Sequence, residues 1–283
     1  MKHLRVLARL VQFEHTIFAL PFAYTGAVLA ADGFPGWSTL LWITVAMAAA
    51  RSTAFALNRL IDREIDARNP RTAARPSVTG EVSVTAMVGL ALVCGAALFV
   101  AAAQLNRLCV VLAPIPLALF VVYPYTKRFT WLAHAVLGLA IAGAPVGGWL
   151  AVSGSWQVPA TLLGFCVLFW MAGLDILYAL QDMDHDRAHG LHSVPQRFGV
   201  APSLLISDAA HVLAAGFLVG AGIAASVRWP FFLAAAVAMA LLVYEHSLVR
   251  PGDLSRINRA FFTVNSYFAV VVFAGALGTV ALP

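Results

Sequence analysis

Long runs of apolar residues, broken by short polar segments, constrain this chain more than any other feature. Several runs reach about 18 residues or more, long enough for a helix to cross a hydrocarbon core of about 30 Å. Charged residues make up only 11% of the 283 residues, against roughly 25% in a typical soluble domain. The sequence lacks the alternating segments of about 10 residues that build membrane β-barrels. It therefore predicts an all-α polytopic membrane protein, formed as a single domain over residues 1–283.

The apolar runs predict nine transmembrane helices. Turn residues and charges separate the runs, and the expected boundaries follow from those separators. The predicted spans are 16–31, 38–57, 84–103, 107–123, 131–152, 158–179, 204–224, 229–248 and 261–281. A short amphipathic helix over residues 1–15 is expected to lie in the membrane interface ahead of them.

The basic residues predict the orientation of these spans. If the N-terminus is inside, 16 of the 18 Lys and Arg residues lie at the inner face, and only Arg107 and Arg228 do not. Lys and Arg are enriched in cytoplasmic loops, so the N-terminus is predicted to be cytoplasmic and the C-terminus outside. Nearly all acidic residues share the inner face, which the charge rule does not require. They indicate a working site on the cytoplasmic side of what we expect to be a bacterial inner membrane.

The first acidic cluster lies in Asn58–Arg75, the most charged segment of the chain. Asn58, Asp62 and Asp66 recur every four residues, so on a helix they form one polar stripe. Carboxylates at this spacing repel one another unless a cation lies between them. Mg²⁺ is typically held by one or two carboxylates together with substrate phosphates. The alternative is a solvated loop in which these carboxylates pair with Arg59, Arg63 and Arg68.

A second acidic cluster lies 120 residues further along the chain, at Asp182 and Asp186. Asp175 and Tyr178 precede it on the same predicted helical face. Asp175 falls inside an apolar span, where a carboxylate costs about 2.5–3.5 kcal/mol and marks a functional candidate. Tyr178 could equally belong to the aromatic belt of the interface. The two clusters together predict a metal site formed by Asn58, Asp62, Asp66, Asp182 and Asp186.

Several basic residues could bind an anionic substrate at this face. Arg51 lies seven residues before Asn58, about 10 Å deeper at 1.5 Å per residue, and could hold a carboxylate or phosphate; the alternative is that it snorkels to the interface. Lys127 and Arg128 lie on another inner loop and could neutralise phosphate oxygens, as could Arg63 and Arg68. Topology-setting charge is the alternative for these four residues.

The two motifs and the loop between them resemble the UbiA superfamily of intramembrane prenyltransferases. The matching stretches are NRLIDREID (58–66), YPYTKR (123–128) and YALQDMDHDRAHGLHSVPQRFG (178–199). The resemblance implies nine helices around a central cavity, capped by cytoplasmic loops. It also implies Mg²⁺-dependent transfer of a prenyl group from a prenyl diphosphate to a lipophilic acceptor. The form of the second motif resembles the branch that prenylates hydroxybenzoate.

The expected substrates follow from this resemblance. They are a polyprenyl diphosphate and the ring of an aromatic acid: 4-hydroxybenzoate, for ubiquinone, is the first expectation, and a dihydroxynaphthoate, for menaquinone, is the alternative. Asp175 is one candidate for the base that removes the ring proton, and Arg51 for the residue that orients the acceptor. Membrane lipid is an expected partner and nucleic acid is not; the oligomeric state stays open. A transporter is the alternative from a different class.

Overall fold

Helices account for almost all regular structure in the computed structural model, which describes residues 19–282. The predicted helix over residues 1–15 lies outside the described residues. Among residues 19–282, eight helical segments are long and apolar enough to cross a membrane. A ninth apolar helix, α2 (Leu20–Ala31), has 12 residues. The all-α membrane fold is therefore confirmed, and the count is close to the predicted nine.

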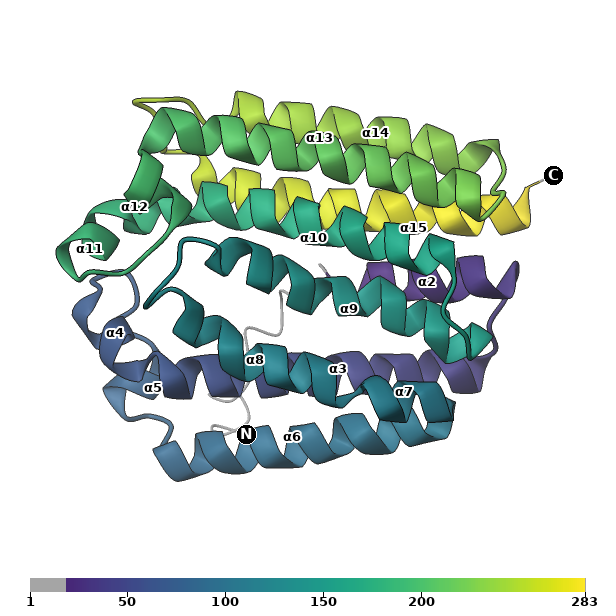
Figure 1. Ribbon diagram of the computed structural model, residues 1–283, viewed down its shortest axis with the longest axis horizontal. Coiled ribbons are helices and arrows are strands. Elements are labelled where there is room, and N and C mark those ends of the chain that lie inside the picture. Colours follow the sequence, from purple (N-terminus) through teal and green to yellow (C-terminus); the bar gives the residue numbers. More distant parts are fainter. Residues whose placement is uncertain (1–18, 283) are drawn as a thin grey trace.

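The long helices lie side by side in one bundle (Figure 1). The predicted span over 107–123 is a pair of helices that meets at Pro114, where proline begins a new first turn. The predicted span over 261–281 begins as a π-helical turn, η3. The long elements are α3 (Trp37–Ile61), α6 (Val84–Leu105), α7 (Arg107–Leu112) with α8 (Pro114–Thr126), α9 (Ala133–Ser153), α10 (Val158–Ala179), α13 (Val200–Ala224), α14 (Trp229–Ser247) and η3 (Arg259–Val264) with α15 (Asn265–Ala281).

Two loops at one end of the bundle repeat the same plan. Each follows a long helix, runs through short helices, and has a glycine with a left-handed backbone before the next long helix. These glycines are Gly80 (φ 82°) and Gly199 (φ 80°), where a side chain would be strained. The first loop holds α4 (Arg63–Arg68) and α5 (Pro76–Thr79), and the second holds η2 (Leu180–Asp182), α11 (Met183–Ala188) and α12 (Val194–Phe198).

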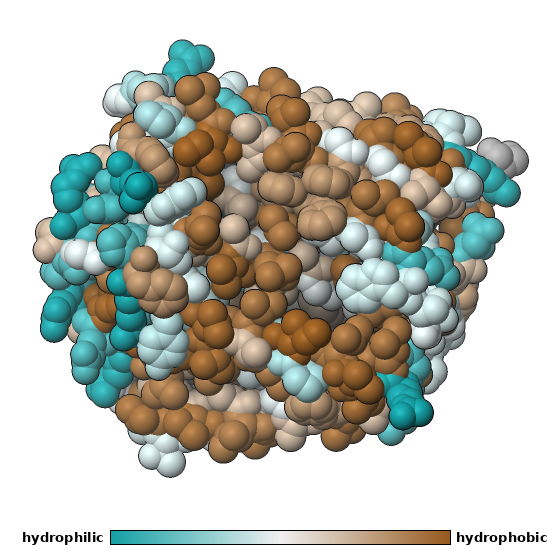
Figure 2. Space-filling model, viewed as in Figure 1, coloured by the Kyte–Doolittle hydropathy of each residue, from teal (hydrophilic) through white to brown (hydrophobic). Residues whose placement is uncertain are grey.

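The surface is divided in the way a membrane requires. Figure 2 shows a broad apolar band over the middle of the bundle, with hydrophilic residues gathered mainly at the end that carries α4, α5, α11 and α12. Large apolar side chains such as Leu92 of α6, Leu205 of α13 and Val243 of α14 are exposed on the long helices. Lipid solvates them, so their exposure costs nothing. This integral membrane protein thus concentrates its polar loops at one end.

Close backbone contacts hold α2 against α9. A Cβ added to Gly26 would collide with the carbonyl oxygen of Pro145, and one added to Gly148 would collide with that of Ala23. Helices in lipid associate through close packing of small residues, because lipid removes the hydrophobic drive between them. The glycines therefore let α2 lie directly on α9.

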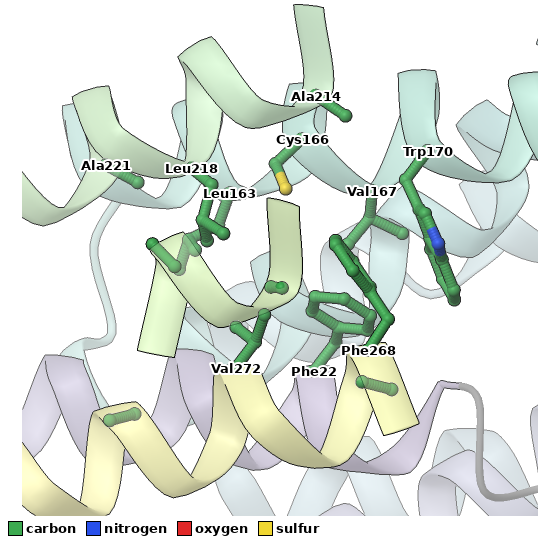
Figure 3. Close-up of a cluster of buried hydrophobic side chains, with 14 of the residues drawn as sticks. Phe22, Leu163, Cys166, Val167, Trp170, Ala214, Leu218, Ala221, Phe268 and Val272 are labelled. Carbon is green, nitrogen blue, oxygen red and sulfur yellow. The ribbon is translucent and has the colours of Figure 1, made fainter. Parts of the chain in front are cut away.

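An aromatic stack joins α10 to α2 and α15, and a chain of hydrogen bonds joins α10, α15 and α14. Trp170 of α10 packs on Phe22 and Phe268, with ring centroids 5.1 and 5.2 Å apart (Figure 3). Its indole Nε1–H donates to Asn265 Oδ1 (2.7 Å), and the Asn265 amide donates to Glu245 Oε1 (3.0 Å) and to the carbonyl of Ala260 in η3 (2.9 Å). The chain fixes the π-helical turn against α10 and α14.

Candidate active site

Asp62 closes α3 at the polar end of the bundle. Its backbone bends there (φ −91°, ψ 3°), but the helical hydrogen bonds continue on both sides of it. The Asn58 amide (2.9 Å) and the Lys127 ammonium (2.6 Å) both donate to Asp62 Oδ2. Burial raises the pKa of the Asp62 carboxyl, and the charge of Lys127 opposes that rise. The predicted stripe is thus present, and Lys127 reaches it from another loop.

Asp66 lies one turn further along and is also buried. Arg75 Nη1 donates to Asp66 Oδ1 at 2.6 Å, and Arg59 Nη1 lies 3.9 Å from Asp66 Oδ2. The Thr72 hydroxyl donates to the backbone carbonyl of Asp66 (2.8 Å), so the loop folds back over its own helix. Asp66 is therefore held by the chain that follows it, through Arg75 rather than through Arg63 or Arg68.

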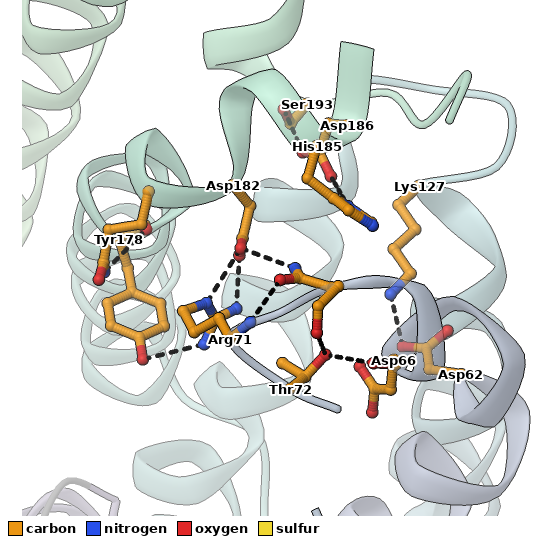
Figure 4. A network of polar contacts seen from close by, with 12 residues as sticks. Asp62, Asp66, Arg71, Thr72, Lys127, Tyr178, Asp182, His185, Asp186 and Ser193 are labelled. Carbon is orange, nitrogen blue, oxygen red and sulfur yellow. Dashed lines mark hydrogen bonds and ion pairs between the residues drawn. The ribbon is translucent and has the colours of Figure 1, made fainter. Parts of the chain in front are cut away.

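Asp182 joins the two loops. Arg71 of the first loop donates through Nε to Asp182 Oδ1 (2.9 Å) and through Nη2 to Oδ2 (2.5 Å), and the Asn69 amide donates to Oδ1 (2.9 Å). Burial lowers the pKa of Arg71, but its bonds to Asp182 outweigh burial and raise it overall. Figure 4 shows Arg71 between Asp182 and the ring of Tyr178. The two predicted clusters are thereby brought together across more than 100 residues.

Tyr178 accepts a hydrogen bond at its hydroxyl and packs its ring against a guanidinium. Arg71 Nη1 donates to its hydroxyl (3.3 Å), and the guanidinium lies 5.2 Å from the ring centroid. Phe261 of the π-helical turn packs 4.1 Å away, centroid to centroid. Such contacts fix the ring, which places Tyr178 in the polar network rather than loose in the interface.

Asp186 lies on the second loop, apart from Arg71. The Ser193 hydroxyl donates to Asp186 Oδ2 at 2.9 Å, and His185 Nδ1 lies 3.8 Å from Oδ1. Ser193 also caps α12 by accepting from the Gln196 amide. The cap fixes the hydroxyl that holds Asp186 (Figure 4).

Asp175 lies deeper, in α10, and has a partner that the sequence analysis did not identify. His134 Nδ1 lies 2.7 Å from Asp175 Oδ2. His134 itself is buried at the start of α9, and the backbone N–H of Val194 donates to its Nε2 (3.2 Å). The predicted intramembrane carboxylate is therefore paired, as its cost in lipid requires.

The four remaining arginine candidates lie in different surroundings. Arg51 lies in α3 with its guanidinium 4.7 Å from the centroid of the Phe55 ring. Arg128 donates to the carbonyl of Ile61 (2.8 Å) and lies 3.9 Å from Asp62 Oδ1. Arg63 donates to the carbonyl of Ser77 and so braces the first loop, whereas Arg68 is exposed. Of these, Arg128 lies beside a clustered carboxylate.

The carboxylates fit a divalent metal. Asp62 Oδ1 and Asp66 Oδ2 are buried, and neither accepts a hydrogen bond from any described residue. Such oxygens are the ligands that Mg²⁺ prefers. Among residues 19–282, no three His, Cys, Asp or Glu side chains are close enough to form a metal centre alone.

An apolar cavity of about 430 Å³ lies beyond these residues in the bundle. This volume is typical of small-molecule sites, about 300–1,000 Å³. Ala50, which precedes Arg51, lines it, as do Leu119 of α8 and the glycines Gly143 and Gly147 of α9. The bundle therefore combines a charged end with a largely apolar cavity, which suits a ligand with an anionic head and a hydrocarbon tail.

Sequence reasoning missed several residues of the site. Asn69, Arg71 and Arg75 lie in the highly charged segment Asn58–Arg75. Only the folded structure shows which of its arginines reach Asp66 and Asp182. His134 gave no spacing signal, because its partners Asp175 and Val194 are 41 and 60 residues away. Ser193 is only seven residues from Asp186 but was not identified. A polar side chain at the inner end of an apolar span, as at His134, is the one signal that could have found it.

Known proteins resemble this chain over nearly its whole length. The model of the UbiA prenyltransferase family matches residues 19–276. A protein of Aromatoleum aromaticum named 4-hydroxybenzoate octaprenyltransferase is 34% identical, over 90% of this chain and 86% of its own. One of the same name from Nitrosomonas eutropha is 32% identical, over 95% of both chains.

Solved structures show the same fold. A UbiA homologue from Aeropyrum pernix K1, in its apo form, superposes with a TM-score of 0.85 at 32% identity, over 93% of this chain and 97% of its own. A homologue from Archaeoglobus fulgidus, bound to DMAPP and Mg²⁺, has a TM-score of 0.71 at 19% identity, over 94% of this chain and 98% of its own. With the family model covering almost all described residues, the chain belongs to the UbiA prenyltransferase family.

Proposed function

We propose that this prenyltransferase moves a polyprenyl group from polyprenyl diphosphate to the ring of 4-hydroxybenzoate, with Mg²⁺ as its cofactor. The observation that carries the proposal is the apposition of two aspartate loops at one end of a bundle that also encloses an apolar cavity. The acceptor is supported by relatives named 4-hydroxybenzoate octaprenyltransferase. Those names do not favour the dihydroxynaphthoate alternative, and membership of the family sets the transporter aside.

The charged end is proposed to bind the diphosphate. Asp62, Asp66, Asp182 and Asp186, with Asn58, would hold Mg²⁺. When bound, the metal neutralises phosphate oxygens and so makes diphosphate a better leaving group. Lys127 and Arg71 already lie at this site, and their donors match phosphate oxygens. Arg128 is placed to do the same, while Arg63 braces the loop and Arg68 remains a candidate for first contact with the anion.

The acceptor is proposed to lie between the diphosphate and the apolar interior. Arg51 is the residue that would bind its carboxylate. Tyr178 presents a fixed ring at the same end, and an aromatic face favours positive charge as the C–O bond breaks. The new bond forms between the allylic carbon and the ring carbon, and the ring proton passes to Asp175. The apolar walls exclude water that would otherwise capture the cation.

The cavity is proposed to take the hydrocarbon tail. Its lining comes from α2, α3 and α6 to α10, with several small residues from α9, and its largely apolar walls suit an isoprenoid chain. The charged end is proposed to face the cytoplasm of a bacterial inner membrane, as the positive-inside rule requires for the Arg and Lys residues gathered there. Bacterial relatives support that location.

The proposal is tested with purified protein in lipid, geranyl diphosphate and Mg²⁺. 4-Hydroxybenzoate and a dihydroxynaphthoate are offered separately, with and without EDTA, and products are identified by mass. We expect an EDTA-sensitive adduct with 4-hydroxybenzoate. An adduct with the naphthoate alone would overturn the acceptor, and release of diphosphate without any adduct would overturn ring transfer.

A further inference from the structure

His134 connects three parts of the molecule that are distant in sequence. It is the second residue of α9, it is buried, and it contacts Asp175 of α10 through Nδ1 (2.7 Å) and the backbone of Val194 in α12 through Nε2 (3.2 Å). Neither contact is with a residue of its own helix. The ring is therefore held on both nitrogens, which fixes its plane.

The contacts determine which nitrogen carries the proton. A backbone N–H can only donate, so the bond from Val194 requires a lone pair on His134 Nε2. The single ring proton of a neutral imidazole is then on Nδ1, where it faces Asp175 Oδ2. Protonation of Nε2 would break the bond to Val194. The geometry thus describes a histidine that accepts a hydrogen bond at Nε2 and donates one from Nδ1 to Asp175 Oδ2.

The same short helix positions His134 and Asp186. Ser193, whose hydroxyl donates to Asp186 Oδ2 (2.9 Å), directly precedes Val194, and both begin α12. Val194 is itself buried. Two consecutive residues therefore set the orientation of a candidate metal ligand and of the His134 ring.

The second oxygen of Asp175, Oδ1, is available to accept a proton. Among the described residues no donor contacts Asp175 Oδ1, and the side chain is 19% exposed, whereas that of His134 is 6% exposed. A carboxylate with one oxygen fixed by a neutral donor keeps the second oxygen at a defined position. Misplacement of about 1 Å in a reacting group can cost about 10²-fold in rate.

We propose that His134 is a positioning residue: as a neutral hydrogen-bond donor it orients Asp175 so that its free oxygen meets the acceptor ring. The inference rests on the proposed function, in which Asp175 takes the ring proton. It assigns no proton transfer to His134. A side chain with one donor and one acceptor, but no titratable group, should therefore replace it.

Two substitutions separate this role from others. His134→Gln keeps an N–H for Asp175 and an oxygen for Val194, and it does not titrate. His134→Leu has a similar volume and keeps neither bond. Adduct formation, the KM for geranyl diphosphate, the pH profile and the thermal midpoint are measured for wild type, H134Q, H134L, Asp175→Asn and the double variant H134L/D175N.

We expect H134L to lower kcat by about 10-fold or more, with the KM for geranyl diphosphate within about twofold of wild type. H134Q should stay within about threefold of wild type and keep its pH profile. In a D175N background, H134L should lower kcat little further, because the two residues act as a unit.

Three results would overturn the inference while wild type makes adduct: full activity in H134L, equal loss in H134Q and H134L, or additive losses in the double variant. Equal loss in both variants would assign acid–base chemistry to the imidazole. A wild-type protein that makes no adduct with either acceptor would instead overturn the proposed function.

Discussion

Arg71 grips the carboxylate of Asp182 with two nitrogens, although the two residues are 111 positions apart. A fork of this kind matches a carboxylate or a phosphate better than the point charge of lysine does. The same guanidinium donates to the hydroxyl of Tyr178. One side chain therefore ties both aspartate loops to α10.

Replacement of Arg71 tests that link. Arg71→Ala should raise the KM for geranyl diphosphate by about 10-fold or more, because it removes a charged donor worth roughly 1.5–3 kcal/mol. Arg71→Lys should give a KM between those of wild type and R71A, since lysine keeps the charge but cannot form the two parallel hydrogen bonds of a guanidinium. Arg256→Ala, at an exposed position of another loop, serves as the control and should change little. An unchanged KM in R71A would remove Arg71 from the site.

The carboxylates can be tested without emptying the site. Asp62→Asn and Asp182→Asn keep the shape of the side chain but lose the charge that binds metal. Each should lower adduct formation by more than about 100-fold, beyond the effect of losing an outer-shell partner. The protein should still be expressed and keep its helical circular dichroism. Folded variants that retain full rate would refute the metal assignment.

Arg51 is expected to act on the acceptor alone. Arg51→Ala should raise the KM for 4-hydroxybenzoate and leave the KM for geranyl diphosphate nearly unchanged, because Arg51 lies in α3 above the Phe55 ring, well before Asp62. Steady-state kinetics with one substrate varied at a time separates the two constants. Equal changes in both would assign Arg51 to the diphosphate or to the fold.

The glycines of α9 are expected to leave room for a long hydrocarbon tail in the cavity. A Cβ at Gly143 would meet no atom within 4 Å, and Gly143 lines the cavity. Gly143→Leu should therefore fold, yet lower the rate with a long polyprenyl diphosphate much more than with geranyl diphosphate. Gly95→Leu is the matched control, since it has equal open space but lies outside the cavity lining. An equal loss of rate with the long and the short diphosphate in G143L would contradict the assignment of this cavity to the tail.

Metal and diphosphate should stabilise the protein together. Asp62 Oδ1 and Asp66 Oδ2, which accept no hydrogen bond from the described residues, would provide only part of a coordination shell, and Mg²⁺ is typically completed by phosphate oxygens. A ligand at 100 times its Kd adds about 2.7 kcal/mol. We expect a clear rise in thermal midpoint with Mg²⁺ and geranyl diphosphate, but a small one with either alone. An equally large rise with Mg²⁺ alone would indicate a complete metal site in the protein.

The fold followed from hydropathy because lipid leaves few alternatives. A long apolar run must form a helix to satisfy its backbone, so 84–103 or 229–248 could be placed within a few residues of α6 or α14. The break at Pro114 and the π-helical turn at Arg259 were not foreseen. The first lies where proline begins a new first turn, and at the second the Asn265 amide donates to the carbonyl of Ala260.

The site was predictable only where its residues repeat along one segment. The spacing of Asn58, Asp62 and Asp66 marks a shared face, and the structure keeps it. Which cation meets which carboxylate depends on how the loops fold. Asp66 pairs with Arg75, nine residues away, and Asp62 with Lys127, 65 residues away. Periodicity within a helix carries no information about such pairs.

The polar chain through Trp170 and Asn265 has a mechanical consequence. It fastens α10, α14 and α15 to one another, and α10 is mostly buried. Across the bundle, the buried share is smaller in α3 and in the α7–α8 pair than in α10. A polar tie there runs from the Asn106 amide to the carbonyl of Leu150 (2.7 Å). The helices joined through Trp170 and Asn265 should therefore move as one unit, and a bulky hydrocarbon chain in the cavity should displace the α7–α8 pair more than α10.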